Sequence, residues 1–225
     1  MAERVNPFIV LDYETGGLIA AKNAITEIAM IGVSGETLQE VGRYESYVYP
    51  YLYEYDQKAL DYTGITMDKL YDKGKDLKTV VVEMAEKFDE WYKKTSNSRY
   101  KKPILVGHNI TFDIGFIQQT FKDCKIDLSK YIAGEKDFFG NFFPTFIDTI
   151  HISKLALGHD DTMTSYKLTN CCMKMGVDLT DAHKAMNDVE ATKELLIKYV
   201  NKLRSAGDGD SSNKIRLRDH HHFQY

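Results

Sequence analysis

The chain has 225 residues, of which 29 are basic and 33 acidic, so its formal net charge is −4. With 43% hydrophobic residues it can bury a sizeable core in one domain, and no apolar run approaches the roughly 20 residues of a membrane helix. The first residues lack the apolar segment of a signal peptide and there are only 3 cysteines, so we expect a cytoplasmic protein with no membrane contact and no disulfide framework.

The first predicted elements are three strands, at 8–11, 25–33 and 43–50, because these segments are apolar or alternate between apolar and polar residues. The connections between them are short, which favours an antiparallel meander. Asp76 can cap the next helix, in which apolar residues keep a 3.6-residue period through Trp91. Strands and helices then alternate: a strand at 104–106, a helix at 111–121, a strand at 146–147, and helices at 149–157, 165–175 and 184–203. This order predicts an α/β fold with a mixed five-stranded sheet flanked by helices.

The composition changes after Arg204. Residues 205–213 are mostly small or polar and cannot bury much surface, which is typical of a linker. We therefore expect one domain over residues 1–204 and a flexible tail over residues 205–225. Ile215, Leu217 and the neighbouring arginines of this tail are candidates for contact with a protein partner.

Two acids follow the first predicted strand in the segment Asp12-Tyr13-Glu14-Thr15-Gly16-Gly17-Leu18. Strand alternation places Asp12 and Glu14 on one face, roughly 7 Å apart at Cα. Two carboxylates so placed repel each other, so either one is protonated or a cation lies between them. A solvated turn explains an Asp-x-Glu pair alone equally well.

A second motif, Gly107-His108-Asn109-Ile110-Thr111-Phe112-Asp113, joins the fourth predicted strand to its helix. Asp113 lies in the first helical turn, where the helix dipole favours a negative charge. Capping by Asn109 or Thr111, with Phe112 in the core, is an alternative explanation for this motif.

A third motif begins at His183 and ends at Asp188, which lies inside the last predicted helix. The helix-propensity cost of an aspartate there is only a few tenths of a kcal/mol. A solvated Asp188 and a surface His183 with no functional role therefore remain an alternative explanation for this motif. Together, however, the three motifs supply four carboxylates, which suit Mg²⁺ or Mn²⁺ rather than zinc. Such clusters can hold two ions roughly 3.5–4 Å apart for phosphoryl chemistry, and a nearby histidine can deprotonate water.

The ordered set Asp-x-Glu-Thr-x-Gly-Leu, His-Asn-x-x-Phe-Asp and His-x-Ala-x-x-Asp resembles the DEDD 3′→5′ exonucleases, which include DnaQ-like proofreading subunits and ribonuclease T. The resemblance runs from about Phe8 to Leu203 and implies a ribonuclease H-like fold. It implies that two Mg²⁺ or Mn²⁺ ions are held by Asp12, Glu14, Asp113 and Asp188. It also implies that His183 is the general base, which marks the DEDDh branch of the family.

The resemblance further implies a site for the 3′-terminal nucleotide. Backbone groups of Thr15 and Gly17 would approach this nucleotide, while Leu18 and Phe112 would pack on its bases. Asn109 of the second motif is also expected to bind the substrate. Gly16 is a departure, since many members carry a second threonine there, and this change could loosen substrate contacts.

The function implied is release of nucleoside monophosphates from the 3′ ends of single-stranded DNA or RNA, in proofreading or end trimming. A polymerase or another protein is an expected partner through the tail. The alternative is a catalytically silent nucleic-acid or protein-binding module on the same fold. Two further expectations concern residues outside the three motifs. Asp148 is expected to cap a helix. The aromatic segment 138–143 is expected to lie in the core or against a partner.

Overall fold

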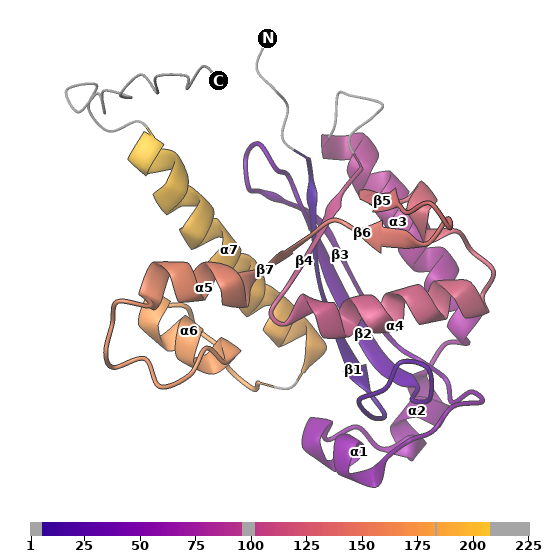
Figure 1. Cartoon of the computed structure of the whole chain (residues 1–225). Coiled ribbons are helices and arrows are strands. Elements are labelled where there is room, and N and C mark those ends of the chain that lie inside the picture. The colour runs from indigo at the N-terminus through magenta and orange to yellow at the C-terminus, as the bar shows by residue number, and fades with distance from the viewer. Residues whose placement is uncertain (1–5, 96–101, 183, 208–225) are drawn as a thin grey trace, which may run out of the picture.

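A five-stranded mixed sheet, in the order β3-β2-β1-β4-β7, forms the centre of the computed structural model, which describes residues 6–95, 102–182 and 184–207 (Figure 1). Its strands are β1 (Phe8–Thr15), β2 (Ile25–Val33), β3 (Glu40–Tyr47), β4 (Ile104–Gly107) and β7 (Phe146–Asp148). β1, β2 and β3 form the antiparallel meander, whereas β4 pairs with β1, and β7 with β4, in parallel. The predicted fold class is therefore confirmed.

Helices cover both faces of this sheet (Figure 1). The α-helices of the described residues are α1 (Gln57–Thr63), α2 (Met67–Lys73), α3 (Leu77–Thr95), α4 (Ile110–Asp123), α5 (Thr149–Leu157), α6 (Leu168–Met175) and α7 (Ala185–Gly207). Because side chains alternate along β1, Ile9 and Leu11 pack with α3 and α4, while Val10 packs with Ala185 and Val189 of α7. Within the described residues, no helix combines the length and apolar character needed to cross a bilayer.

The differences from the predicted elements concern short segments. α1 and α2 have 7 residues each, too few for a clear apolar period, although Asp56 and Thr66 cap them by accepting N–H bonds. β3 ends at Tyr47, and Val48, whose N–H still donates to the Thr26 carbonyl at 3.0 Å, forms an isolated bridge with Lys75. α6 begins at Leu168, three residues after its predicted start, and α7 continues to Gly207, past the expected domain boundary. The rest of the expected tail lies outside the described residues.

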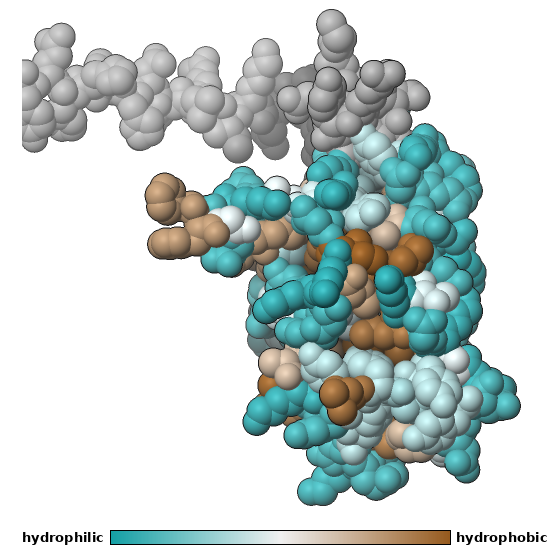
Figure 2. All heavy atoms as spheres, turned by 90° about the vertical axis from the view of Figure 1, so that its right-hand side faces the viewer, coloured by the Kyte–Doolittle hydropathy of each residue, from teal (hydrophilic) through white to brown (hydrophobic). Residues whose placement is uncertain are grey.

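A small hairpin of β5 (Gly134–Lys136) and β6 (Phe142–Pro144) was not predicted and carries the aromatic segment. Phe142 packs against the core, but Phe138 and Phe139 are 97% and 85% exposed, so the core interpretation is wrong for these two residues. Figure 2 faces the side of the molecule that carries the hairpin and shows apolar side chains among mainly hydrophilic ones.

β3 forms one edge of the sheet and is tied to α7 by charged side chains. Arg43 of β3 contacts Glu40 at 2.8 Å and Glu190 of α7 at 2.6 Å. Lys193 of α7 contacts Glu40 at 3.3 Å. These pairs lie at the surface, so each contributes at most about 1 kcal/mol to stability.

Trp91 of α3 packs on two glycines that lie opposite each other, Gly32 of β2 and Gly42 of β3. A Cβ atom at Gly32 would lie 2.6 Å from Cε3 of Trp91, and one at Gly42 would overlap its Nε1. The absence of side chains at these positions therefore permits the close approach of α3 to the sheet.

We expect Gly42→Ala to lower the free energy of unfolding by about 1–3 kcal/mol, because the added methyl overpacks the Trp91 contact. Urea unfolding followed by the fluorescence of Trp91, the 1 tryptophan of the chain, measures this. Gly115→Ala in α4 is the control: its Cβ would meet Ala20 at an ordinary 3.7 Å, so it should be neutral or stabilise by up to about 1 kcal/mol. Equal stability of Gly42→Ala and wild type would contradict the proposed contact.

Candidate functional site

Three carboxylates converge where β1 meets the start of α7. Asp12 and Glu14 point to the same face of β1, and Asp188 lies in the first turn of α7. One ligand oxygen from each of the three lies within 4.8 Å of the others. The packing of Ala185 and Val189 on the sheet holds this turn against β1.

Asp113 approaches β1 from the first turn of α4 and is 3% exposed. Its Oδ1 accepts the backbone N–H of Tyr13 at 3.0 Å. Strand pairing between β1 and β4 ends at Val10 and Val106, so the Tyr13 N–H lies beyond the ladder and the Asp113 carboxylate takes the place of a strand partner. This bond fixes α4 relative to the other acids.

Burial and mutual repulsion raise the pKa of these acids. Loss of solvation, followed by the charges of Asp188 and Glu27, raises the pKa of Asp12 to about 7. Burial and the charge of Asp12 raise the pKa of Glu14 to about 9. The pKa of Asp113 also lies well above its usual range because of burial and Asp12, although the Tyr13 N–H lowers it. Without a cation, the cluster therefore holds protons at neutral pH.

Glu27 of β2 is a further buried acid that the sequence analysis missed. It lies directly opposite Glu14 in the β1–β2 register, is 3% exposed, and contributes to the raised pKa of both Asp12 and Glu14. Burial raises the pKa of Glu27 itself, whereas a hydrogen bond from Tyr47 lowers it. The sequence does contain a signal for Glu27, because it is an acid inside the mainly apolar run 25–33.

The donor set fits a hard divalent cation. The three closest ligands are all carboxylates, and within the described residues they form the one group of three or more acids, histidines or cysteines close enough to share an ion. Oxygen-only donors suit Mg²⁺ or Mn²⁺. A cation would also offset the repulsion that raises the pKa of Asp12 and Glu14.

The predicted base, His183, lies outside the described residues. Asn109 adopts a left-handed conformation (φ 73°) at the start of α4, and its side chain makes no capping bond. Its backbone N–H donates to Asp148 Oδ1 at 3.1 Å, and the same oxygen accepts the Ile150 N–H at 2.9 Å. Asp148 therefore caps α5, as predicted, and also joins α5 to the turn before α4.

Two cavities flank the acid cluster. The first, which we call the β1 cavity, has a volume of about 440 Å³. Its walls include Tyr13, Glu14, Thr15, Gly17, Leu18, Tyr62 and Phe112. The structure thus brings Thr15, Gly17, Leu18 and Phe112 together, and Leu18 is 83% exposed.

The second, which we call the α6 cavity, has a volume of about 690 Å³. Its walls include Tyr62, His108, Asn109, Lys154, Tyr166, Lys167 and Asp188. Asn109 thus lines a different cavity from Thr15, Gly17, Leu18 and Phe112. Tyr62 of α1 lines both cavities.

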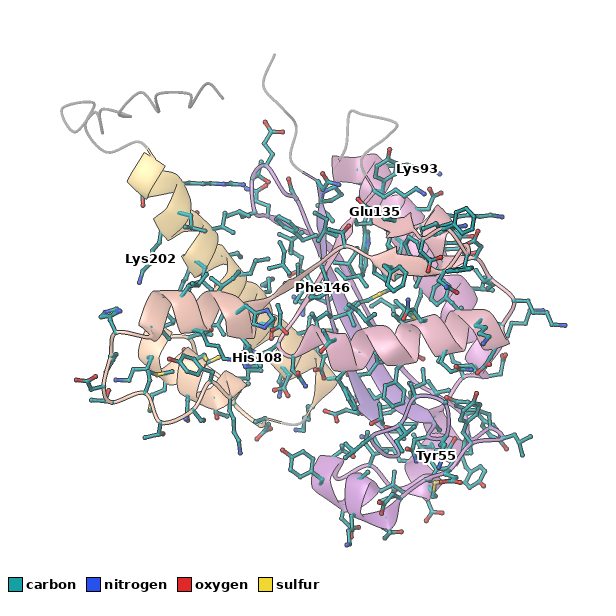
Figure 3. All side chains as sticks on the ribbon, viewed as in Figure 1. Tyr55, Lys93, His108, Glu135, Phe146 and Lys202 are labelled. Atoms are coloured by element: carbon teal, nitrogen blue, oxygen red, sulfur yellow. The ribbon has the colours of Figure 1, made fainter. Side chains whose placement is uncertain are left out.

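His108 lies at the end of β4 beside α5 (Figure 3) and connects the walls of the α6 cavity. Its Nε2 donates to the Tyr166 carbonyl at 2.8 Å, and its Nδ1 lies 2.9 Å from Thr149 Oγ1. Burial lowers the pKa of His108, which favours the neutral ring. In a neutral ring with the proton on Nε2, Nδ1 is an acceptor, and it shares the single Thr149 hydroxyl proton with the Gly107 carbonyl, which lies 3.1 Å from the same oxygen.

The sequence matches the family described as "Exonuclease" (RNase_T) over residues 9–196. A DNA polymerase III PolC-type protein of Oceanobacillus iheyensis is 30% identical over 213 residues, which cover 95% of this chain and 12% of that protein. The PolC-type protein of Bacillus cereus is 30% identical over 193 residues, which cover 86% of this chain and 11% of that protein. The chain spans about an eighth of the length of these relatives.

Solved structures share the fold. E. coli exonuclease I in complex with a dT13 oligonucleotide has a TM-score of 0.67 and 22% identity, covering 90% of this chain and 42% of that chain. The zinc-bound form of the E. coli exonuclease I–single-stranded DNA complex has a TM-score of 0.67 and 22% identity, covering 89% and 42%. At these identities, the matches establish the common architecture.

We expect the metal-free protein to lose stability as the pH rises. The pKa is raised from 3.8 to about 7 at Asp12 and from 4.5 to about 9 at Glu14, so the folded state holds protons that the unfolded chain releases. The stabilisation is complete below the pKa values of the unfolded chain and is lost as the pH rises through the pKa values of the folded state. In EDTA, the melting temperature should therefore fall between about pH 5 and about pH 9.

Asp12→Asn should make this fall shallower and should raise the melting temperature in EDTA near neutral and alkaline pH, because one repelling charge is removed. Glu86→Gln, at an exposed position of α3, is the control and should keep the wild-type pH dependence. A melting temperature that is the same across this pH range in wild type and Asp12→Asn would show that the acids are not electrostatically strained.

Proposed function

The chain belongs to the exonuclease family, and from this premise we propose that it is a metal-dependent 3′→5′ exonuclease of the DEDDh type. It would release nucleoside monophosphates from the 3′ ends of single-stranded DNA or RNA. The observation that carries the proposal is the placement of Asp12, Glu14 and Asp188 within ligand distance at the junction of two cavities.

In this proposal, two Mg²⁺ or Mn²⁺ ions would be held by Asp12, Glu14, Asp188 and Asp113. Bound divalent ions lower the pKa of water and stabilise charge on the oxygens around phosphorus. Asp113, which is fixed by the Tyr13 N–H, would complete a set of four acids carried by β1, α4 and α7. The raised pKa of Asp12 and Glu14 supports this assignment, because cation binding would relieve their repulsion.

The β1 cavity would receive the 3′-terminal nucleotide. Thr15 and Gly17 are joined by a 2.7 Å bond from the Thr15 hydroxyl to the Gly17 carbonyl, which orders the turn beside Glu14. Exposed Leu18 and the ring of Phe112 offer apolar surfaces to a base. A terminal 3′-hydroxyl is neutral, whereas a 3′-phosphate would add about two negative charges beside the acids.

His183 would act as the general base. It precedes Asp188 by five residues, in the spacing of the DEDDh motif. A neutral imidazole accepts a proton from water near neutral pH, which a carboxylate engaged with a cation does less readily.

The relatives suggest where such an activity would work. PolC-type proteins are DNA polymerases by name, and E. coli exonuclease I is solved with single-stranded DNA. We extend the proposal to a single-stranded substrate and a polymerase context in the cytoplasm. Residues 1–204 would form the exonuclease domain, and residues 205–225 a tail available for a protein partner.

We expect Mg²⁺ or Mn²⁺ to support stepwise shortening of a 5′-labelled single strand from its free 3′-hydroxyl, and EDTA to stop it. Asp12→Asn or Asp113→Asn should lower the cleavage rate by more than about 100-fold. Loss of a residue that only hydrogen-bonds to a metal ligand lowers activity by at most about 100-fold, so a larger loss indicates a direct ligand. Gel electrophoresis of the products measures both effects, with Glu86→Gln as the control.

A 3′-phosphate should inhibit the reaction strongly, and circular single-stranded DNA should remain uncut. Parallel reactions on matched DNA and RNA strands establish the preferred sugar. Cleavage of the circle would indicate an endonuclease, and full activity in EDTA would contradict metal dependence. Binding of the strand without any cleavage would instead support the silent binding module.

His183→Ala should lower the rate by about 10²–10⁴-fold at neutral pH if the histidine is the base. The wild-type rate should rise with pH through the histidine range, because only the neutral ring accepts a proton. His159→Ala, at an exposed histidine, is the control. A wild-type rate for His183→Ala would remove it from the reaction.

A further inference from the structure

We infer that the α6 cavity receives the second nucleotide from the 3′ end, and that Lys154 and Lys167 contact the phosphate on the 5′ side of that nucleotide. The inference rests on the proposed function, which places the scissile phosphate at the acids. It adds a second subsite to the terminal-nucleotide site in the β1 cavity.

The position of the cavities supports this assignment. Glu14 lines the β1 cavity and Asp188 lines the α6 cavity, yet ligand oxygens of these two residues lie within 4.8 Å of each other. A phosphodiester held at the acids therefore has one nucleotide on each side. The larger volume, about 690 Å³ against about 440 Å³, belongs to the side on which the strand would continue.

The charges distinguish the two cavities. The α6 cavity contains two lysines, Lys154 and Lys167, and a single acid, Asp188. The β1 cavity contains one lysine, Lys58, together with Glu14 and Asp56. Phosphates upstream of the scissile bond carry negative charge and are not neutralised by ions at the acid cluster, so a strand needs cationic side chains on that side.

The two lysines are available for such a contact. Both are exposed, and within the described parts of the chain neither enters an ion pair. Lys154 projects from the last turn of α5, and Lys167 is the residue before the first turn of α6. They therefore approach the same cavity from two different helices.

The wall that carries Lys167 is fixed rather than loose. The preceding residue, Tyr166, accepts the His108 Nε2–H bond through its carbonyl at 2.8 Å. His108 is in turn bonded to Thr149, whose hydroxyl lies 3.1 Å from the Gly107 carbonyl at the end of β4. The chain before α6 is thus connected to the central sheet next to the acids.

An aromatic side chain stands between the two proposed subsites. Tyr62 is 68% exposed and lines both cavities. A tyrosine ring can stack on a base of any sequence, which suits an enzyme that removes successive nucleotides. The α6 cavity would therefore read the charge and the ring shape of the second nucleotide rather than its identity.

The test compares two dinucleotides in the presence of Mg²⁺: TpT, which has no 5′-phosphate, and pTpT, which carries one on its second nucleotide. We expect the wild type to cleave pTpT with a kcat/KM about tenfold higher than that for TpT, because a charged hydrogen bond to the 5′-phosphate contributes an effect of about this size. In Lys154→Ala/Lys167→Ala the ratio of the two kcat/KM values should fall close to 1.

The matched control is Lys78→Ala/Lys122→Ala, which removes the same charge at exposed positions of α3 and α4 and should keep the tenfold ratio. The p-nitrophenyl ester of thymidine 5′-monophosphate, which presents no second nucleotide, reports whether each variant is folded and active at the acids. A wild type that cleaves TpT and pTpT equally, or a Lys154/Lys167 variant that keeps the ratio, would overturn the inference. A wild type that cleaves neither the ester nor a longer strand would instead overturn the proposed function.

Discussion

The repulsion between carboxylates buried around β1 is the constraint to which the rest of the structure responds. Asp12 and Glu14 lie on the part of β1 that pairs with β2 alone, and strand alternation keeps both side chains on one face, so they cannot move apart. Glu27 faces Glu14 from the next strand, and Asp188 approaches from α7. The apolar contacts of α7 with the sheet, together with the bond between Asp113 and the Tyr13 N–H, hold this arrangement.

The same arrangement divides the substrate region in two. A cluster placed at the surface of a flat sheet would offer one open face to a strand of nucleic acid. Here α1 and the α5–α6 segment supply cavity walls next to the sheet, so the acids line two cavities that differ in charge and volume. Recognition and chemistry are thus assigned to different elements: the sheet and α7 carry the acids, and the surrounding helices carry aromatic and cationic side chains.

The sequence predicted the parts of the molecule that have strong local signals. The apolar run 25–33 coincides with β2, and the spacing of the three motifs identified the acids that converge. α1 and α2 were missed because 7 residues hardly establish a helical period. Glu27 was missed because its importance depends on register with Glu14, and the α6 cavity because Tyr62, Lys154 and Lys167 meet only through tertiary packing.

The ion pairs along β3 bear on self-association. An edge strand exposes N–H and C=O groups that can recruit a strand from another molecule. On β3, Arg43 and Glu40 are engaged with Glu190 and Lys193 of α7, so an incoming strand would meet charged side chains at this edge. At the opposite edge β7 has only 3 residues, too few to template a long pairing. Both edges of the five-stranded sheet therefore disfavour its extension by a strand from another molecule.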